Sequence, residues 1–501
     1  MSTGIPSNPA SMREDDVILA IDQGTTGTTA LLLDRNVQVR ASHNVEFPNY
    51  YPQPGHVEHD VEEIWDSVRQ AVTAARAKAR GTTIRAIGIT NQRETSLFWD
   101  RQTGKAIHRA LVWQDRRTAD ICARLKSAGH EPMVREATGL VLDPYFSGTK
   151  AGWLLNHVDG ARSRAEAGEL AFGTIDAWLA NRLCGAHATD AANASRTLLF
   201  DLRTGAWSPK LCELLGVPMA TLPRVCDNAE QLGLTSGIDF LPDGIPVSGM
   251  AGDQQSALFG QACFAPGAAK CTYGTGAFLL MNTGDQMVAS EHGLLTTVAW
   301  RLGGKTTFAL EGSAFIAGAA VQWLRDGLGI IQSASEIEAL ANSVPDSGGV
   351  SFVPALAGLG APHWRPDARG LVTGITGGTT KAHLARAVLE GVALQNVDML
   401  RAMAADADTA IAELKVDGGA ARNNLLIQLQ ADLLGAACVR PTVLETTALG
   451  AAFLAGLGAG LFTDTSAITE AWVEDRRFVP TMDEVEVGRR LAVWAQAVAR
   501  A

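Results

Sequence analysis

Two segments of the chain share one pattern of apolar and polar positions: an apolar run, a short turn rich in Gly and Thr, and a second apolar run. The first is ILAIDQGTTGTTALLLD (residues 18–34), and the second is AAKCTYGTGAFLLMN (residues 268–282). This pattern is typical of a β-hairpin with a tight polar loop. Glycine lets the backbone approach a ligand closely, and successive N–H groups in such a turn bind anions. Two such loops on two related domains favour a nucleotide triphosphate held from both sides of a cleft.

Elsewhere the chain alternates apolar runs of strand length with segments whose apolar residues recur at helical spacing. The pattern predicts strands at residues 17–21, 29–33 and 84–90, hairpins between residues 268 and 309, and helices at residues 61–80, 118–128, 313–328, 381–404, 423–434, 448–458 and 485–501. Such alternation predicts an α/β fold with mixed sheets. We expect a disordered leader at residues 1–16, an N-terminal domain at residues 17–261 and a homologous C-terminal domain at residues 262–501.

The composition narrows the class of protein. A chain of 501 residues exceeds the size at which one core keeps growing, which agrees with two domains. The formal net charge of −11 argues against nucleic acid or an anionic membrane as the main partner. The sequence has no charge-free stretch of membrane-spanning length and no signal-peptide core in its leader. The seven cysteines show no CxxC spacing, so we expect reduced, mostly buried thiols in a cytoplasmic protein.

Asp22 follows the first apolar run and enters the Gly/Thr turn. A carboxylate beside a phosphate-binding turn is unfavourable unless a cation lies between them, so Asp22 is a candidate for holding Mg²⁺, directly or through water. An Asp that caps a hairpin turn is a comparable interpretation. The second loop, at residues 273–276, favours the phosphate interpretation.

Three charged residues are candidates for acid–base work or for binding hydroxyl groups. Asp253 lies in GMAGDQQ, a turn of small residues before a predicted helix. It could accept a proton from a substrate hydroxyl, although Asp is also a preferred helix N-cap. Arg93 and Glu94 follow the strand at residues 84–90 and offer hydroxyl groups a donor fork and an acceptor. The alternative for this pair is an ion pair on the surface.

Further segments contain residues that could contact the carbon face of a polyol or the edge of a purine. Trp113, Tyr145 and Phe278 could pack against a polyol, although any one of them is more often a core residue. In ELKVDGGAARNN a strand runs into Asp417-Gly418-Gly419, and Asn423 could bind a purine edge, unless this is an ordinary strand–helix turn. The segment GHVEHD, with His56 and His59, lacks the rest of a metal-ligand set, so we interpret it as a loop and a helix cap.

The chain resembles the bacterial glycerol kinases, members of the FGGY carbohydrate kinase family, over about residues 17–478. The segments that carry the resemblance are, in order, DQGTT, ITNQRET, VWQDRRT, TGLVLDPYFSGTK, TDAANASRT, GMAGDQQSALFGQ, TYGTGAF, GLGAP and VDGGAARNN. Both FGGY signature regions are recognisable, at residues 145–157 and 370–390, with Ala151 in place of the usual larger apolar residue. The resemblance implies the actin/Hsp70-type ATPase fold, in which two RNase H-like domains flank a central cleft.

The resemblance also implies ATP-dependent phosphorylation of glycerol to sn-glycerol 3-phosphate, in glycerol catabolism, with Asp253 as the general base and Mg²⁺ held near Asp22. It implies a glycerol pocket in the N-terminal domain and nucleotide contacts that come largely from the C-terminal domain. The implied glycerol pocket comprises Arg93, Glu94, Trp113, Tyr145, Asp253, Gln254 and Phe278. The implied nucleotide contacts are Thr25, Thr26, Gly27, Thr275, Gly318, Gln322, Gly419 and Asn423. We expect a homo-oligomer, either a dimer or a tetramer, with no nucleic acid partner and no membrane insertion.

The sequence departs from the family in two places. Glycerol kinases usually carry Ser-Ser-Arg or Ser-Thr-Arg after DQGTT, whereas this chain has Gly27, Thr28 and Thr29, so a positive charge near the phosphates is missing. Some bacterial relatives bind fructose 1,6-bisphosphate through a Gly/Arg-rich loop, and the corresponding segment here, TSGIDFLPDGIP at residues 235–246, has no Arg or Lys. We therefore expect activity that is insensitive to this bisphosphate.

Two other hypotheses stay open at this point. A related FGGY kinase would phosphorylate a ketopentose or another polyol. A non-catalytic, sugar-sensing or actin-like scaffold is the other, although the intact Asp22 and Asp253 speak against it.

Overall fold

The computed structural model describes residues 12–501, so the expected leader at residues 1–16 lies mostly outside it. Met12 is buried and Asp16 begins the first strand, so the fold starts earlier than the sequence predicted. The chain divides into two compact units. Unit 1 runs to Ala262 and also includes Thr297–Phe308 and Thr447–Ala471, whereas unit 2 consists of Cys263–Thr296, Ala309–Thr446 and Trp472–Ala501. The chain therefore passes between the units more than once, where the sequence indicated a single boundary near residue 261.

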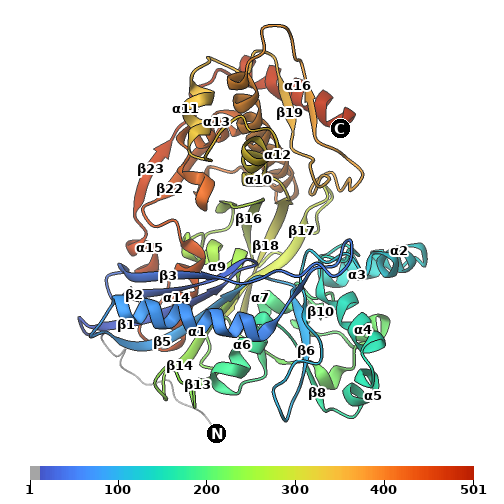
Figure 1. Ribbon diagram of the computed structural model, residues 1–501, viewed down its shortest axis with the longest axis vertical. Helices are drawn as coiled ribbons and strands as arrows, with labels where there is room; N and C mark the ends of the chain where they lie inside the picture. Colours follow the sequence, from blue (N-terminus) through green and yellow to red (C-terminus); the bar gives the residue numbers. More distant parts are fainter. Residues whose placement is uncertain (1–11) are drawn as a thin grey trace. The chain divides into compact units, whose positions relative to one another are not determined.

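Unit 1 is built on a six-stranded sheet in the order β13-β14-β5-β1-β2-β3 (Figure 1). β1 pairs antiparallel with β2 and parallel with β5, and β5 in turn runs parallel to β14. Parallel neighbours end at the same edge of a sheet, so the segments that follow β1, β5 and β14 come together there. The strands are β1 (Asp16–Gln23), β2 (Gly27–Asp34), β3 (Val39–Glu46), β5 (Thr83–Asn91), β13 (Gly233–Leu234) and β14 (Pro246–Gly252).

Helices cover both faces of this sheet because β1 and its neighbours are apolar on both sides. Leu19 and Ile21 share a core cluster with α1 and α6, whereas the intervening Ile18 faces the helix α14. A Cβ on Gly88 would overlap the carbonyl of Ala451, so glycine lets α14 pack directly on β5. The longer helices of unit 1 are α1 (Val61–Lys78), α2 (Ala119–Ser127), α3 (Glu131–Thr138), α4 (Ser147–His157), α6 (Ile175–Cys184), α8 (Pro209–Leu215), α9 (Asp253–Gly260) and α14 (Thr446–Gly458).

A smaller four-stranded sheet in unit 1 has the order β4-β7-β6-β8. Its strands are β4 (Glu58–His59), β7 (Ala110–Leu111), β6 (Ser96–Asp100) and β8 (Leu170–Thr174). The other short elements of unit 1 are β9 (Ala188–Asp190), β10 (Phe200–Asp201), β11 (Ala206–Trp207), β12 (Arg224–Cys226), α5 (Ala161–Glu166), α7 (Ala191–Ala194) and α15 (Ser466–Ala471).

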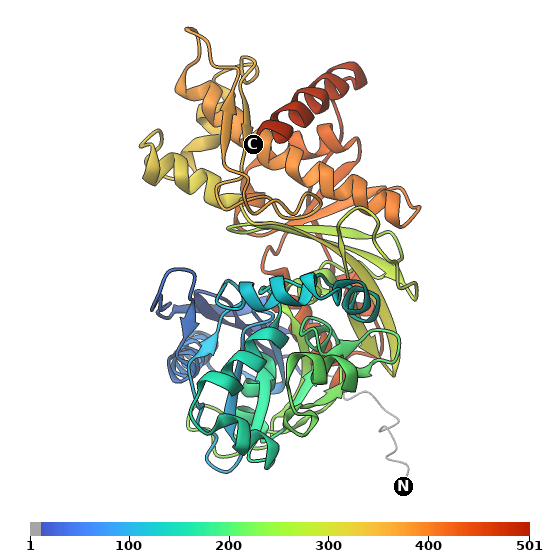
Figure 2. The ribbon, with the colours of Figure 1, turned by 90° about the vertical axis from the view of Figure 1, so that its right-hand side faces the viewer.

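Unit 2 repeats the strand arrangement of unit 1 in its seven-stranded sheet, β17-β18-β16-β15-β21-β22-β23 (Figure 2). β15 pairs antiparallel with β16 and parallel with β21, and β21 runs parallel to β22. These four strands correspond in order to β1, β2, β5 and β14 of unit 1. The strands are β15 (Ala269–Tyr273), β16 (Ala277–Gly284), β17 (Leu295–Leu302), β18 (Lys305–Ala314), β21 (Glu413–Asp417), β22 (Ala437–Pro441) and β23 (Glu474–Phe478), with β19 (Ser351–Val353) and β20 (Leu371–Thr373) apart. Its helices are α10 (Gly318–Gln322), α11 (Glu336–Asn342), α12 (Lys381–Asp406), α13 (Asn424–Leu434) and α16 (Glu484–Arg500).

The expected α/β fold with mixed sheets is confirmed, and most predicted elements agree with the observed ones to within a few residues. The helix predicted at residues 313–328 is wrong at its start. Ser313 and Ala314 belong to β18, and helical structure begins only at Gly318, followed by a π-helical turn at Trp323–Gly327. Strand pairing across the sheet therefore overrode the local apolar pattern. All seven cysteines are free, and only Cys184 is not fully buried.

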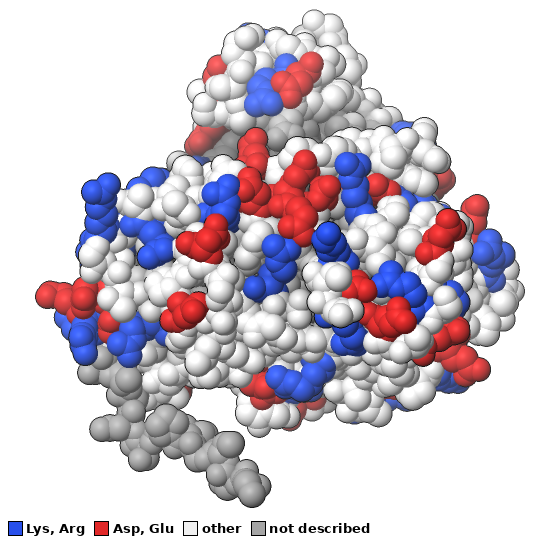
Figure 3. Space-filling model, turned by 60° about the horizontal axis from the view of Figure 1, so that its bottom comes forward, with Lys and Arg blue, Asp and Glu red and all other residues white. Residues whose placement is uncertain are grey.

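The surface drawn in Figure 3 carries Lys and Arg side chains interspersed with Asp and Glu side chains. Near the upper middle of that view several Asp and Glu side chains lie together, and elsewhere on that face the two signs are mixed. Of the helices in residues 12–501, none combines the length and the apolar character that crossing a membrane requires.

Candidate active site

The ends of three parallel strands bring the charged candidates of unit 1 to one edge of its sheet. Asp22 lies near the end of β1, Arg93 and Glu94 follow β5, and Asp253 follows β14. The strands β1, β5 and β14 are neighbours, so residues from distant parts of the sequence meet because of the sheet order. This is the edge at which open α/β sheets bind ligands.

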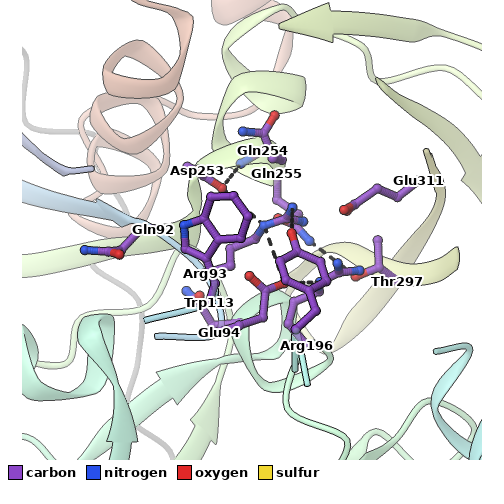
Figure 4. A network of polar contacts seen from close by, with 12 residues as sticks. Gln92, Arg93, Glu94, Trp113, Arg196, Asp253, Gln254, Gln255, Thr297 and Glu311 are labelled. Atoms are coloured by element: carbon purple, nitrogen blue, oxygen red, sulfur yellow. Dashed lines mark hydrogen bonds and ion pairs between the residues drawn. The ribbon is translucent and has the colours of Figure 1, made fainter. Parts of the chain in front are cut away.

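Arg93 is buried and contacts several other side chains of the group (Figure 4). Its Nε lies 3.2 Å from Asp253 Oδ1, its Nη1 donates to Gln255 Oε1 at 3.3 Å, and its Nη2 donates to Tyr145 Oη at 3.4 Å. The guanidinium therefore orients the carboxylate of Asp253. The alternative of a surface ion pair is wrong, because the Arg93 and Glu94 side chains are each only 2% exposed.

Glu94 is held in an unusual backbone conformation by its surroundings. Its φ of 61° lies in the left-handed region, which a non-glycine residue occupies at a cost of about 1–3 kcal/mol and which is found most often at functional sites. Its Oε1 accepts a hydrogen bond of 2.8 Å from Nε of the fully buried Arg196. Arg196 is the functional candidate that the sequence left unassigned. Its only sequence signal was its place in TDAANASRT, 102 residues from Glu94.

The aromatic candidates of unit 1 link the charged group to the first Gly/Thr turn. Trp113 and Tyr145 pack edge to face with ring centroids 5.6 Å apart. Trp113 Nε1 donates a 2.9 Å hydrogen bond to Thr25 Oγ1, so the turn and the aromatic pair are connected. Gln254 is buried in α9, beside Asp253. The remaining candidate, Phe278, lies half-buried on β16 of unit 2.

Asp253 and Asp22 form a pair of carboxylates suited to a divalent cation. Asp253 is the first residue of α9, and Gly252 takes the N-cap position that was an alternative for Asp253. Desolvation, together with repulsion from the Asp253 carboxylate, raises the pKa of Asp22 to about 7 from its usual 3.8. A cation between two carboxylates relieves such repulsion, and Mg²⁺ is commonly held by one or two carboxylates plus phosphate oxygens. Among residues 12–501 no group of three or more His, Cys, Asp or Glu side chains could hold a metal by itself.

The turn between β1 and β2 is fixed by a hydrogen bond between its own ends and by a contact from Gln92. The N–H of Gly24 donates to the carbonyl of Gly27 at 2.9 Å, which closes the turn and leaves Thr26 exposed. Gln92 Nε2 donates to the carbonyl of Gly24 at 3.1 Å and lies 3.3 Å from Nδ1 of His59. The sequence interpretation of His59 as part of a loop is wrong, because it is a fully buried residue of β4; Asp60 is the helix cap, at the start of α1.

Unit 2 brings most of the nucleotide candidates to one edge of its own sheet. The turn between β15 and β16 is closed by a 2.9 Å hydrogen bond from Gly274 N–H to the Gly276 carbonyl, one residue shorter than the span of the corresponding bond in unit 1. The N–H of Gly318 donates to Gly274 at 3.0 Å, and a Cβ on Gly318 would lie 2.6 Å from the Gly274 carbonyl, so this contact with the turn requires glycine. Thr275 is exposed at the tip of that turn, and Gln322 is exposed at the end of α10.

Gly419 and Asn423 follow β21, which runs parallel to β15. Gly419 is exposed and opens a short 3₁₀-helix, Gly419–Arg422. Asn423 is the N-cap of α13, and its Oδ1 accepts a 2.9 Å hydrogen bond from the N–H of Leu426. Its side-chain NH₂ group is therefore the part that could contact a purine, because its Oδ1 already caps the helix.

Comparisons with known proteins agree with this arrangement. The sequence model of the FGGY family of carbohydrate kinases, N-terminal domain, matches residues 17–260, and the sequence model of the C-terminal domain of that family matches residues 269–459. The glycerol kinase of Myxococcus xanthus is 60% identical over 490 residues, 97% of this chain and 99% of that protein. The glycerol kinase of Dechloromonas aromatica is 56% identical over 97% of this chain and 98% of its own length.

Solved structures give the same result for the fold. The crystal structure of Plasmodium falciparum glycerol kinase with ADP superposes with a TM-score of 0.91 at 36% identity and covers 98% of both chains. A gluconate kinase from Lactobacillus acidophilus, at 22% identity and a TM-score of 0.85, shares the fold over 97% of both chains. The repeated hairpin-and-parallel-strand pattern of the two units is thus that of the actin/Hsp70-like ATPase fold, and the chain belongs to the FGGY family of carbohydrate kinases.

Proposed function

We propose that the protein is an ATP-dependent glycerol kinase, which transfers the γ-phosphoryl group of ATP to glycerol and forms sn-glycerol 3-phosphate. The observation that carries the proposal is the ion pair between Arg93 and Asp253, with Nε and Oδ1 3.2 Å apart, beside the edge-to-face pair Trp113 and Tyr145. This group combines a carboxylate, a buried cation and apolar rings, which are the chemical types that a small polyol requires.

Asp253 is the general base in this proposal. Its side chain is 31% exposed, so it is the accessible carboxylate of the group, whereas Glu94 is buried. A carboxylate at this position can accept the proton of the attacking hydroxyl, while Arg93 fixes its orientation. Glu94 and Arg93 would bind the other hydroxyl groups as acceptor and donor, and the rings of Trp113 and Tyr145 would contact the carbon chain.

The nucleotide would use the two Gly/Thr turns and the edge of the unit 2 sheet. On this proposal residues 17–261 supply the polyol and phosphate contacts, and residues 262–501 supply most of the nucleotide contacts. Asp22 is the residue that would hold Mg²⁺, which when bound neutralises charge on the phosphate oxygens. The backbone N–H groups around Thr26 and Thr275 are the donors available to the phosphates.

We propose glycerol as the substrate because of relatives with high sequence identity, and not because of similarity in fold. Eight curated relatives that match over nearly their whole length at 54–60% identity are each named glycerol kinase. The gluconate kinase and the xylulose kinase of Lactobacillus acidophilus match at 22% and 23% identity, so they support the fold alone.

The decisive experiment is a coupled assay of ADP release with ATP, Mg²⁺ and a panel of glycerol, other polyols and ketopentoses. We expect glycerol to give the highest kcat/KM. Asp253→Asn should keep the fold and lose about 10²–10⁴-fold in kcat, because an amide cannot accept the proton. Asp239→Asn, in an exposed loop, is the matched control for loss of one negative charge.

Each alternative gives a distinct result in this assay. Faster turnover of a ketopentose would indicate a sister kinase, and the absence of any glycerol-dependent ADP release would reject the kinase and favour a non-catalytic scaffold. A near-normal kcat in Asp253→Asn would reject Asp253 as the base while leaving the substrate unchanged.

A further inference from the structure

The first turn of helix α4 is buried and contacts the backbone of residues in the candidate glycerol pocket. Ser147, Gly148, Thr149 and Lys150 are all buried, and Lys150 is fully inaccessible to solvent. A lysine in such a place is rare, since burial of a charged ammonium is unfavourable unless it is hydrogen-bonded. The partners of Lys150 therefore indicate why the chain keeps a charge there.

Lys150 binds two backbone carbonyls, and both belong to aromatic residues of the pocket. Its Nζ donates to the carbonyl oxygen of Tyr145 at 3.1 Å and to that of Trp113 at 3.3 Å. The two residues lie 32 positions apart in the sequence, and their rings pack edge to face. One ammonium thus ties together the two chain segments that present these rings.

The rest of the turn binds neighbouring parts of the same pocket. Ser147 Oγ donates to the carbonyl oxygen of Glu94 at 2.8 Å. Thr149 Oγ1 lies 2.9 Å from Thr118 Oγ1, on the segment that continues from Trp113 into α2. Three polar residues of one helical turn, Ser147, Thr149 and Lys150, therefore contact the segments that carry Glu94, Trp113 and Tyr145.

We propose that the first turn of α4, with Lys150 at its centre, is a positioning element that fixes Glu94, Trp113 and Tyr145 for substrate binding. The proposal rests on the proposed glycerol kinase function, because that function gives these three residues their role. Lys150 would act through the backbone and would not touch glycerol.

The charge of Lys150 agrees with this role. Burial lowers its pKa to about 8 from the usual 10.5, while the nearby carboxylates of Asp115, Glu94 and Asp143 oppose that shift and Arg116 adds to it. Near pH 7 the ammonium therefore stays charged and keeps three N–H donors, of which two are used on the carbonyls of Trp113 and Tyr145. An apolar replacement would leave both buried carbonyls without this donor.

The test compares Lys150→Met, Lys150→Arg and Ser147→Ala with the wild-type enzyme in steady-state kinetics of glycerol and of ATP. Positioning of groups that bind glycerol in the ground state and the transition state alike changes KM more than kcat. We expect Lys150→Met to raise KM for glycerol by about 10-fold or more, with KM for ATP changed by less than about twofold. Lys150→Arg keeps the cation and should lie between Met and wild type, and Ser147→Ala should raise KM for glycerol by a few-fold.

The matched control is Leu183→Ala in α6, a fully buried core residue of unit 1 outside the group described here. It should lower the melting temperature, because it leaves a cavity in the core, and it should leave KM for glycerol unchanged, because the Leu183 side chain makes no hydrogen bond to the segments that carry Glu94, Trp113 and Tyr145. An unchanged KM for glycerol in folded Lys150→Met, or a rise that Leu183→Ala reproduces, would overturn the proposal. If Lys150→Met does not fold, Lys150→Arg and Ser147→Ala decide it in the same way. Absence of glycerol-dependent turnover in the wild-type enzyme would instead reject the proposed function.

Discussion

The buried His59 makes unit 1 sensitive to acid, and the structure gives the size of the effect. His59 is fully buried on β4, its Nε2 lies 2.6 Å from Asn49 Oδ1, and its Nδ1 lies 3.3 Å from Gln92 Nε2. Since the amide oxygen of Asn49 accepts and the amide nitrogen of Gln92 donates, these partners select the neutral imidazole with its proton on Nε2. Burial lowers the pKa of His59 to about 4 from the usual 6.5.

When the pKa of a group is lower in the folded state than in the unfolded state, there is a pH range in which only the unfolded chain binds the proton. In that range, acidification lowers the free energy of unfolding. For His59 the stability is fully present above pH 6.5 and is lost as the pH falls toward 4. Between pH 7.5 and pH 5.0 the two pKa values correspond to a loss of about 2 kcal/mol in the free energy of unfolding. The buried Asp190, whose pKa is raised by burial and by the neighbouring Asp176, acts in the opposite direction over this range.

The assay is urea unfolding of wild type and His59→Gln at pH 7.5 and at pH 5.0, followed by circular dichroism and by tryptophan fluorescence. Glutamine offers a donor and an acceptor but does not titrate, so the difference between the two pH dependences isolates His59 from Asp190. We expect wild type to lose about 2 kcal/mol more than His59→Gln on acidification. Parallel pH dependences, within about 0.5 kcal/mol, would refute the reasoning that burial keeps this imidazole neutral.

Three further predictions concern the candidate site and its regulation. Arg196→Met leaves the buried Glu94 carboxylate without its 2.8 Å partner, so we expect about 3–5 kcal/mol of destabilisation in urea and a raised KM for glycerol, with Arg196→Lys less affected; wild-type stability and KM in both variants would contradict this. Thr29 lies directly opposite Asp22 in the β1–β2 pair, so Thr29→Arg should lower KM for ATP and leave KM for glycerol nearly unchanged, and an unchanged or raised KM for ATP would count against it. Fructose 1,6-bisphosphate should not inhibit, because the loop at residues 235–246 carries Asp239 and Asp243 and no basic residue. That loop borders a surface hollow of about 880 Å³ that Arg76, Arg80 and Arg85 also line, so inhibition that disappears in Arg80→Ala would show that arginines outside the loop supply a site.

Local pattern was sufficient for the elements whose contacts are close in sequence. The two Gly/Thr turns were predicted because each hairpin brings its own ends together, and the closing bonds from Gly24 to Gly27 and from Gly274 to Gly276 span only a few residues. The apolar runs on either side were predicted as strands because β1 and β15 are buried on both faces. Helix limits such as those of α12 agreed closely for the same reason, since caps are local.

Local pattern failed where a distant partner decided the structure. Residues 313–314 have an apolar context that suits a helix, yet they extend β18, because hydrogen bonds to a neighbouring strand are invisible in the local sequence. His59 was assigned to a loop because nothing near it in sequence shows that Asn49 and Gln92 enclose it. Asn423 was considered for a purine, and only the start of α13 shows that its oxygen is already used as a cap.

The sequence by itself determined the family, the α/β class, the two Gly/Thr turns and the candidate residues of the site. The tertiary structure decided which of those residues meet: β14, β5 and β1 are adjacent and parallel, so Asp253, Arg93 and Asp22 come to one edge although up to 231 positions separate them. It also decided that Arg93 and Glu94 are buried, that Arg196 donates a hydrogen bond to Glu94, and that Lys150 donates one to the backbone of Tyr145. The physical reason is that burial and charge pairing depend on distances through space, and periodicity along the chain records only which face of an element is apolar.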